Sequence, residues 1–425
     1  MAKMDDLWLV LPHLGPGGAQ KVALLAADHF AAQGLSLRVV TLLPGHSIAH
    51  CLPDGLDHCD LGPAVEAAWR RDYWNRSLAA RGRRFVFAQR RRLHRIAAKL
   101  LLLLVWPWLS GEAKPGRNGL ASGLLCWCVH GVGGPQALLL QDLFRQHQPQ
   151  RVLAFLSRTN MLVCQALWDS STHLVISERN DLSRQSLPFP WQRLREVLYQ
   201  RADVVTANTD GVRQSLECLP NLQRLELLPN PLPRKDDSLH VANAADGIRP
   251  EAFVTVARLV PQKGIDVLIR ALALMTGSAS QWPVVLVGDG PERPALESQA
   301  VAEGVAHRVH FEGSRSDPEV LLAAASVFVL PSRFEGMPNA LLEAMAAGLA
   351  VIVTDASPGP LEVVEHRRSG IVVPREDPHA LAKAMSELVE DVDLRNRLGL
   401  AARDRLAALD WPQVETQWRS VLALP

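Results

Sequence analysis

The chain has 425 residues, 48% of them hydrophobic and 21% charged, and its 45 Lys and Arg almost balance its 44 Asp and Glu. This length suits about two domains with their own cores, and the neutral balance excludes a generally basic nucleic-acid coat. Residues 70–99 nevertheless hold ten Arg and Lys99 against one acid, Asp72, so this basic block has a net charge of +10 (eleven cations less one acid). We expect a local function for it.

The first half of the chain is predicted to form an α/β unit with an irregular zone at about 44–150. A 3.6-residue period predicts a helix over 18–32. Glycines in Gly15-Pro-Gly-Gly-Ala-Gln20 would let a ligand approach the start of this helix, although Gln20 breaks the dinucleotide-binding pattern and a plain tight turn is the alternative. Short apolar runs predict strands at Leu7–Leu11, Leu37–Leu43, Arg151–Leu156, Leu174–Ser177 and Val204–Ala207.

Residues 90–105, in and after the basic block, have helical spacing, and Pro107 is predicted to end the helix. A basic amphipathic helix with Trp106 and Trp108 beside it indicates contact of about residues 90–108 with an anionic membrane surface. The alternative is a helix whose apolar face packs inward and whose arginines are solvated. The predicted apolar face holds Leu93, Ile96, Ala97, Leu100, Leu103 and Leu104, and the opposite face holds Arg91, Arg92, Arg95 and Lys99.

The second half alternates continuous apolar strands with amphipathic helices, which predicts a doubly wound parallel sheet. Four regions follow: a first domain over 1–230 with an insertion at about 62–130, a polar linker at 231–250, a second domain over 251–410, and a last helix in 411–425. The predicted strands are Phe253–Leu259, Val284–Gly288, Arg308–Glu312, Val327–Pro331, Ala350–Thr354 and Gly370–Pro374, and the predicted helices are Gly264–Met275, Glu292–Ala302, Glu319–Ala325, Asn339–Ala347, Leu361–His366 and Trp411–Leu424.

Two segments that follow predicted strands of the second domain suggest a ligand site. Arg258 and Lys263 flank a loop at the start of a helix, where two cations can clamp a diphosphate, although solvated surface charges are the alternative. The run Pro331–Gly348 places Glu335 in a loop and Glu343 in the next helix, which Asn339 is expected to cap. Carboxylates beside a phosphate site accept hydrogen bonds from sugar hydroxyls, whereas Glu343 could instead lie on a solvated face.

With Val287-Gly-Asp-Gly-Pro-Glu292 and Phe334-Glu335-Gly336, these motifs make the chain resemble the retaining glycosyltransferases of family 4. The resemblance covers nearly the whole chain except about 62–130. It implies the GT-B architecture of two facing Rossmann-like domains, with Gly17 and Gly18 approaching the donor diphosphate from the first domain. It further implies roles in the second domain: Arg258 and Lys263 neutralise the diphosphate, Glu335 holds the transferred sugar, Glu343 holds the ribose, and the backbone of Gly336, Met337, Pro338, Asn339 and Ala340 lines the site.

Within the family, Phe155–Asn160 and Ile176–Asp181 resemble a subgroup that acts on lipid-linked oligosaccharides or lipopolysaccharide core. The resemblance suggests Thr159, Asn160, Glu178 and Arg179 on the acceptor side. Many relatives carry a His just after the strand Leu174–Ser177, and Glu178 and Arg179 stand there in this chain.

The expected activity is transfer of a hexose or N-acetylhexosamine from a nucleotide sugar, in particular a UDP-sugar, to a lipid-linked or lipopolysaccharide-type glycan. We expect no metal requirement and no cofactor beyond the donor co-substrate, because cationic side chains can stabilise the leaving diphosphate. The expected location is the cytoplasm, on the inner face of the membrane, without a spanning segment or signal peptide, and no nucleic-acid partner is expected. A nucleotide-sugar epimerase or hydrolase, and a nucleic-acid binder using the basic block, remain alternatives; the oligomeric state is open.

Overall fold

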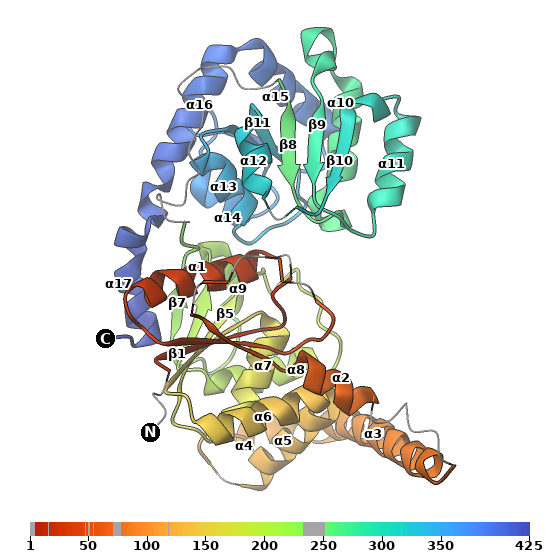
Figure 1. Ribbon diagram of the computed structural model, residues 1–425, viewed down its shortest axis with the longest axis vertical. Helices are drawn as coiled ribbons and strands as arrows, with labels where there is room; N and C mark the ends of the chain where they lie inside the picture. Colours follow the sequence, from red (N-terminus) through yellow and green to blue (C-terminus); the bar gives the residue numbers. More distant parts are fainter. Residues whose placement is uncertain are drawn as a thin grey trace. The chain divides into compact units, whose positions relative to one another are not determined.

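A computed structural model describes residues 5–15, 17–46, 48–49, 52–53, 55–70, 78–117, 119–232, 251–315 and 317–425, with side chains outside 69–90. The chain divides into two compact units, whose elements Figure 1 labels. Unit 1 comprises residues up to Asn208, Val212–Leu228 and Thr416–Pro425, and unit 2 comprises Thr209–Gly211 and Pro229–Glu415. Most of the predicted linker, from 233 to 250, lies outside the described residues.

Unit 1 is built on a seven-stranded sheet in the order β3-β2-β1-β4-β5-β6-β7, with every neighbouring pair parallel. Its central strands are buried on both faces, which explains their continuous apolar sequence. The strands are β1 (Leu7–Leu11), β2 (Leu37–Thr41), β3 (Asp57–Asp60), β4 (Arg151–Phe155), β5 (His173–Glu178), β6 (Val204–Ala207) and β7 (Leu225–Leu227).

The zone at about 44–150, predicted to be irregular, is mostly helical in its described part. The helices of unit 1 are α1 (Gly18–Ala32), α2 (Gly62–Arg70), α3 (Leu78–Leu104), α4 (Trp106–Glu112), α5 (Leu120–Gly133), α6 (Pro135–His147), α7 (Ser157–Ala166), α8 (Trp191–Leu198) and α9 (Asp210–Leu216). The helix predicted to end before Pro107 is α3, which ends at Leu104, and Pro107 itself lies in the first turn of α4, where a missing N–H costs nothing. Helices α4 and α5 both pack on α3 (Figure 1).

Helix α3 does not turn its predicted apolar face inward. Among its described side chains, those of residues 91–104, Ala98 and Leu102 are fully buried, whereas Leu93 and Leu100 on the predicted apolar face are 63% and 53% exposed. Among the described residues no single helix is long and apolar enough to cross a membrane; Arg91–Leu104 and Trp106–Glu112 together reach that length and composition, but an 82° bend separates them.

Unit 2 has a six-stranded parallel sheet in the order β10-β9-β8-β11-β12-β13. Helices on both faces bury its apolar strands in two clusters of side chains. The strands are β8 (Phe253–Val256), β9 (Val284–Val287), β10 (Val309–Gly313), β11 (Val327–Leu330), β12 (Ala350–Thr354) and β13 (Ile371–Val373), and the helices are α10 (Ile265–Leu274), α11 (Arg293–Ala302), α12 (Pro318–Ala323), α13 (Asn339–Ala346), α14 (Pro358–Val363), α15 (Pro378–Glu390), α16 (Val392–Arg405) and α17 (Trp411–Leu422).

Helix α17 carries the chain back from unit 2 into unit 1. The buried ring of Trp418 lies 6.5 Å from that of Phe30 on α1, and Gln417 donates from Nε2 to the Leu227 carbonyl at 2.7 Å. His173 Nε2 lies 2.9 Å from the Val421 carbonyl. The last residues therefore complete the core of the first unit.

Candidate functional site

The candidate site lies at the carboxyl edge of the sheet of unit 2. Strands β8 and β11 are parallel neighbours, so the loops that follow them leave the sheet side by side. The loop after β12 leaves the same edge, because β11 also pairs with β12 in parallel. Open α/β sheets bind ligands at this edge.

Gly264 holds the first two loops together. Its φ of +64° lies in the left-handed region, and a Cβ atom there would stand 2.0 Å from the carbonyl oxygen of Pro331. Only glycine fits such a contact. The backbone N–H of Arg333 donates to the Gln262 carbonyl at 2.8 Å, and Gln262 Nε2 donates to the Phe334 carbonyl at 2.9 Å. These contacts fix Lys263, the residue before Gly264, against the loop that carries Glu335.

Lys263 and Glu335 form a largely buried ion pair. Lys263 Nζ lies 2.5 Å from Glu335 Oε1, and the side chains are 15% and 7% exposed. Ser332 Oγ donates to the same oxygen at 2.6 Å, while the backbone N–H of Glu335 donates to Ser357 Oγ at 2.9 Å. No described residue donates a hydrogen bond to Glu335 Oε2. One oxygen is thus held by the protein and the other remains as an acceptor for a ligand hydroxyl.

A second ion pair supports this loop from behind. Arg333 donates from Nη1 and Nη2 to the two oxygens of Asp266 on α10, each at 2.9 Å, and from Nε to Glu376 Oε1 at 2.8 Å. Burial alone would raise the pKa of Asp266, but the hydrogen bonds and charges of Arg333 and Arg270 lower it below its ordinary value. The hydrogen bond to Asp266 raises the pKa of Arg333. Both groups therefore stay charged, and the loop between β11 and α13 is anchored to α10.

The loop from Gly336 to Ala340 leads into α13, which carries Glu343 on a buried face, 8% exposed. The expectation that Asn339 caps this helix is wrong: Pro338 occupies the cap position, and no side chain caps the helix. Asn339 Oδ1 instead accepts a hydrogen bond from Asn230 Nδ2 at 2.5 Å, and the same Nδ2 lies 3.3 Å from the Met337 carbonyl. Asn230 therefore ties the start of α13 to the beginning of the long segment of unit 2.

The remaining predicted donor residues are Arg258 in unit 2 and the two glycines in unit 1. Arg258 follows β8, is exposed, and forms no ion pair with any residue in the described ranges. Gly17 and Gly18 belong to unit 1, where Gly17 precedes the first turn of α1 in an extended conformation (φ 167°). The predicted donor residues are thus divided between the units, with Lys263, Glu335 and the loop from Gly336 to Ala340 brought together in unit 2.

The four residues suggested for the acceptor side are all buried in unit 1. Thr159, Asn160, Glu178 and Arg179 are at most 7% exposed. Glu178 ends β5, and its carboxylate accepts hydrogen bonds from Ser157 Oγ at 2.9 Å, from the Tyr199 hydroxyl and, at 3.5 Å, from Asn160 Nδ2. These four side chains are part of the interior of unit 1, and the hydrogen bonds of Glu178 suit a group that positions the loop after β5. Their place on the acceptor side stays a prediction.

Burial dominates the electrostatics of this network. It raises the pKa of Glu178, although hydrogen bonds from Tyr199 and Ser157 act in the opposite direction. Burial also lowers the pKa of Arg179 to about 9. The Arg179 guanidinium lies 5.3 Å from the centre of the Phe155 ring, a cation–π contact. Glu178 and Arg179, which stand where the resemblance implies a His, are therefore part of the interior of unit 1.

Several contributing residues escaped prediction from the sequence. Ser332 and Ser357 hold Glu335, Thr354 Oγ1 donates to the Ser332 carbonyl at 2.6 Å, and Asn230 holds Asn339. The sequence feature that could have identified the serines is a small hydroxyl side chain shortly after a predicted strand. It is weak, because serine and threonine are common in loops for other reasons.

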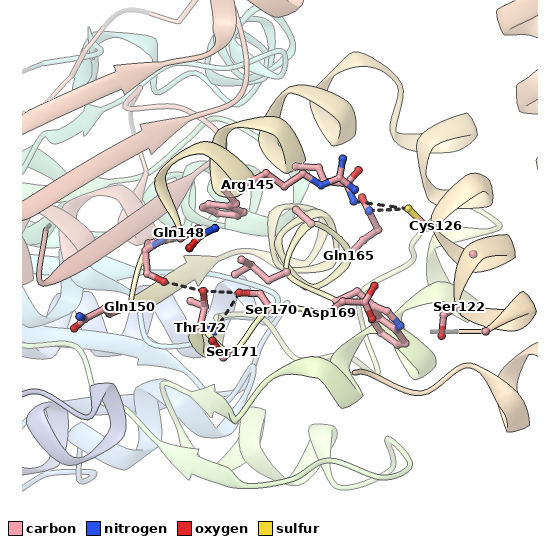
Figure 2. A pocket seen from close by; sticks show the side chains of 18 residues that line it. Ser122, Cys126, Arg145, Gln148, Gln150, Gln165, Asp169, Ser170, Ser171 and Thr172 are labelled. Carbon is pink, nitrogen blue, oxygen red and sulfur yellow. Dashed lines mark hydrogen bonds between the residues drawn. The ribbon is translucent and has the colours of Figure 1, made fainter. Parts of the chain in front are cut away.

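A cavity of about 860 Å³ lies elsewhere in unit 1 (Figure 2). It is lined by residues just before β4 and β5, such as Gln150 and Thr172, so it opens at the amino ends of these strands, away from the edge where ligands of such sheets bind. Figure 2 shows Gln165 directed at Cys126, to which its Nε2 donates at 3.2 Å. None of the predicted site residues lines this cavity.

Comparison with known proteins links the site of unit 2 to a family. Residues 245–405 match the family model of glycosyl transferases group 1. The lipopolysaccharide core biosynthesis glycosyltransferase LpsE of Rhizobium meliloti is 30% identical over 212 residues, 49% of this chain and 60% of that protein. An α-1,4-N-acetyl-D-galactosaminyltransferase of Campylobacter jejuni, whose name gives an undecaprenol-linked glycan as its acceptor, is 24% identical over 67% of this chain and 77% of its own.

The chain spans 20%, 49% and 60% of the length of the first three curated relatives it matches. Among solved structures, HepE of Anabaena in complex with UDP and glucose aligns with a TM-score of 0.70 at 18% identity, covering 99% of both chains. At such identity the likeness concerns the fold. Together with the two parallel sheets it shows that the chain has the GT-B fold, and that its second unit carries a match to glycosyl transferases group 1.

Proposed function

We propose that this protein is a retaining glycosyltransferase that moves a hexose or N-acetylhexosamine from a UDP-sugar to a lipid-linked or lipopolysaccharide-type glycan. The observation that carries the proposal is the Lys263–Glu335 pair at the carboxyl edge of unit 2, next to the loop that leads to Glu343. The match of residues 245–405 supports the reaction class, and the UDP-bound state of HepE supports the donor.

The arrangement suits binding of a sugar diphosphate. Lys263 neutralises Glu335, which allows a carboxylate to stand near phosphates without repelling them. Glu335 Oε2 accepts a sugar hydroxyl, and Glu343 accepts ribose hydroxyls from its place on α13. Arg258, exposed and without an ion-pair partner in the described ranges, supplies further positive charge to the diphosphate.

The chemical step needs stabilisation of the leaving UDP. As the bond between the anomeric carbon and the diphosphate oxygen breaks, negative charge grows on the β-phosphate. In this proposal Arg258, Lys263 and the backbone amides at the start of α13 face the oxygen on which that charge develops, and preorganised donors of this kind lower the barrier. No side chain of the cluster is needed to accept a hydride or hold a metal in this scheme. The oxygen of the acceptor hydroxyl bonds to the anomeric carbon on the face that UDP leaves, and the hydroxyl proton passes to the departing diphosphate oxygen.

The acceptor class rests on the relatives. LpsE is named for lipopolysaccharide core biosynthesis and the Campylobacter protein for an undecaprenol-linked glycan. We propose an acceptor of that chemistry, with Glu178, Arg179, Thr159 and Asn160 positioning the edge of unit 1 and Gly17 and Gly18 approaching the donor diphosphate.

The first test is binding of UDP to Glu343→Ala by calorimetry. Loss of hydrogen bonds between a carboxylate and two ribose hydroxyls should weaken the affinity by about 10–100-fold. Glu303→Ala, an exposed acid of the same unit, is the matched control and should bind UDP like the native chain. Equal affinity of the native chain and Glu343→Ala would remove Glu343 from the donor site.

The second test identifies the reaction. The full chain is incubated with radiolabelled UDP-glucose, UDP-galactose, UDP-GlcNAc or UDP-GalNAc, with and without bacterial glycolipids. Label in the lipid fraction supports the proposal. Turnover of the nucleotide sugar at the same rate without glycolipid would indicate an epimerase or a hydrolase instead.

A further inference from the structure

Helix α3 presents an apolar face to solvent. Beyond Leu93 and Leu100, Ile96 is 45% exposed, Leu103 52% and Leu104 78%. At 100° per residue these five side chains occupy one side of the helix, opposite Ala98 and Leu102, which are fully buried. From Leu93 to Leu104 this side is about 16 Å long. We refer to these five exposed residues as the α3 face.

Packing against α5 fixes which side of α3 points inward. A Cβ atom on Gly131 of α5 would stand 2.8 Å from Ala98 Cβ and 2.9 Å from His94 Cδ2, so the two helices meet across small side chains. His94 Nε2 also lies 3.0 Å from the Trp127 carbonyl. A leucine from the α3 face would not fit at this contact. The exposure of the α3 face is therefore a property of the packing.

Neighbouring elements add exposed aromatic and aliphatic side chains. Trp108 on α4 is 43% exposed, Trp127 on α5 is 40% exposed, and Leu120 at the start of α5 is 81% exposed. The Trp127 ring lies 4.2 Å from that of His94, so it borders α3 directly. Tryptophan is the side chain that favours the boundary between lipid and water.

Cations line one flank of the α3 face. Arg92, Arg95 and Lys99 are exposed and cluster between the buried side and the α3 face, on the side of Leu103. The sequence contains no acid from Arg91 to Gly111. A partner for this surface must accept leucine side chains and supply negative charge along one flank, which is what a bilayer with anionic headgroups provides.

We propose that the α3 face docks on an anionic membrane surface, with α3 lying in the plane of the interface and Arg92, Arg95 and Lys99 contacting lipid phosphates. The 82° bend before α4 separates the two segments, so α3 and α4 do not form one straight span. This inference stands on the exposed side chains and does not depend on the donor site in unit 2.

The test uses the full chain and vesicles of phosphatidylcholine with 30% phosphatidylglycerol or of phosphatidylcholine alone, separated by flotation. The native chain should float with the anionic vesicles and at least tenfold less with the neutral ones. Two variants should each lose at least tenfold of the binding: Leu93→Gln/Leu100→Gln/Leu103→Gln and Arg92→Gln/Arg95→Gln/Lys99→Gln. The matched control, Val301→Gln/Val320→Gln/Leu400→Gln, changes exposed aliphatic residues of unit 2 and should float like the native chain.

Three results would overturn the proposal. The first is equal flotation of all variants. The second is a native dimer that the leucine variant makes monomeric, without vesicle binding, which would assign the α3 face to a second copy. The third is salt-sensitive binding of single-stranded RNA in place of vesicles. UDP affinity, measured in parallel, should be unchanged in every variant, so failure here is distinguishable from failure of the donor site.

Discussion

Glu335 and Glu178 are both carboxylates at the carboxyl ends of parallel strands, and both are less than one tenth exposed. Glu335 is paired with Lys263 and keeps one oxygen unbonded among the described residues. Glu178 accepts its hydrogen bonds from uncharged donors, among them Tyr199 and Ser157, and burial raises its pKa. An ion pair with a spare acceptor suits a ligand site, whereas a buried carboxyl surrounded by neutral donors suits a structural one.

Removing the cation tests the first half of this comparison and should have the largest effect. In Lys263→Met the charge that we propose faces the leaving diphosphate is lost, so the transfer rate should fall by about 10²–10³-fold. Glu335 is left buried without its partner, and the free energy of unfolding should fall by about 3 kcal/mol. Transfer kinetics and urea denaturation measure the two effects.

The double variant Lys263→Met/Glu335→Leu separates the loss of transfer rate from the loss of stability. With both charges replaced by apolar groups, stability should largely return while activity stays lost. If Lys263→Met retained full activity, the pair would be structural and the distinction between Glu335 and Glu178 would disappear.

Changes at Glu178 test the other half and should act mainly on stability. Glu178→Ala leaves the Tyr199 hydroxyl without this acceptor, while Ser157 Oγ keeps Gln185 Oε1 and Asn160 Nδ2 keeps the Ser177 carbonyl, so it should cost about 1–3 kcal/mol of unfolding free energy. Glu178→Gln keeps an acceptor oxygen and should cost less than about 1 kcal/mol. A loss of UDP affinity in Glu178→Gln at native stability would instead place this residue in the donor site.

The raised pKa of Glu178 also predicts a pH dependence. The folded chain holds this proton more tightly than the unfolded chain, whose value is 4.5, so the unfolded state binds fewer protons between 4.5 and the raised pKa. Stability should therefore fall as pH rises through that interval. Glu178→Gln should remove this slope in thermal melts taken across the interval, and an unchanged slope would assign it to another group.

Arg258→Gln should have the smallest effect on stability and on transfer. It tests whether an exposed cation contributes to the proposed donor site. Because Arg258 is exposed and forms no ion pair with a residue of the described ranges, its replacement should change the unfolding free energy by less than about 0.5 kcal/mol. Its contact with the diphosphate should show as about a tenfold loss of transfer rate, which corresponds to about 1.4 kcal/mol. Native kinetics in Arg258→Gln would leave Lys263 as the cation that serves the diphosphate.

Strands and helices of the two sheets were predictable from periodicity, several to the residue: Leu7–Leu11, Gly18–Ala32, Val204–Ala207 and Ala350–Thr354 have the bounds of β1, α1, β6 and β12. For α3 the spacing predicted the part over 90–105, but α2, α4, α5 and α6 were not predicted, and α5 shows why. Its sequence is apolar nearly all round and contains three glycines, so it lacks the polar face that marks an amphipathic helix. Helix α14 begins three residues earlier than predicted, because its first turn contains prolines that resemble a break.

For the site, the resemblance supplied Lys263 and Glu335 but not their pairing. Pairing depends on the contact of Gly264 with the Pro331 carbonyl, which joins residues far apart in sequence. On α3 the spacing gave the apolar face, but the side that packs inward is decided by Gly131 on another helix. Periodicity within one element carries no information about such contacts.

Helix α17 has a consequence for biosynthesis. Unit 1 contains residues 416–425, which are synthesised only after the whole of unit 2. Until Trp418 reaches Phe30, the first unit to leave the ribosome lacks part of its core, although domains usually fold in the order of their synthesis. Unit 2 is continuous over Pro229–Glu415 and can form nearly all of its contacts first. Unit 2 can then complete its fold before unit 1, which is the reverse of the order in which they are translated. Unit 1 therefore depends on protection from aggregation for the longer time.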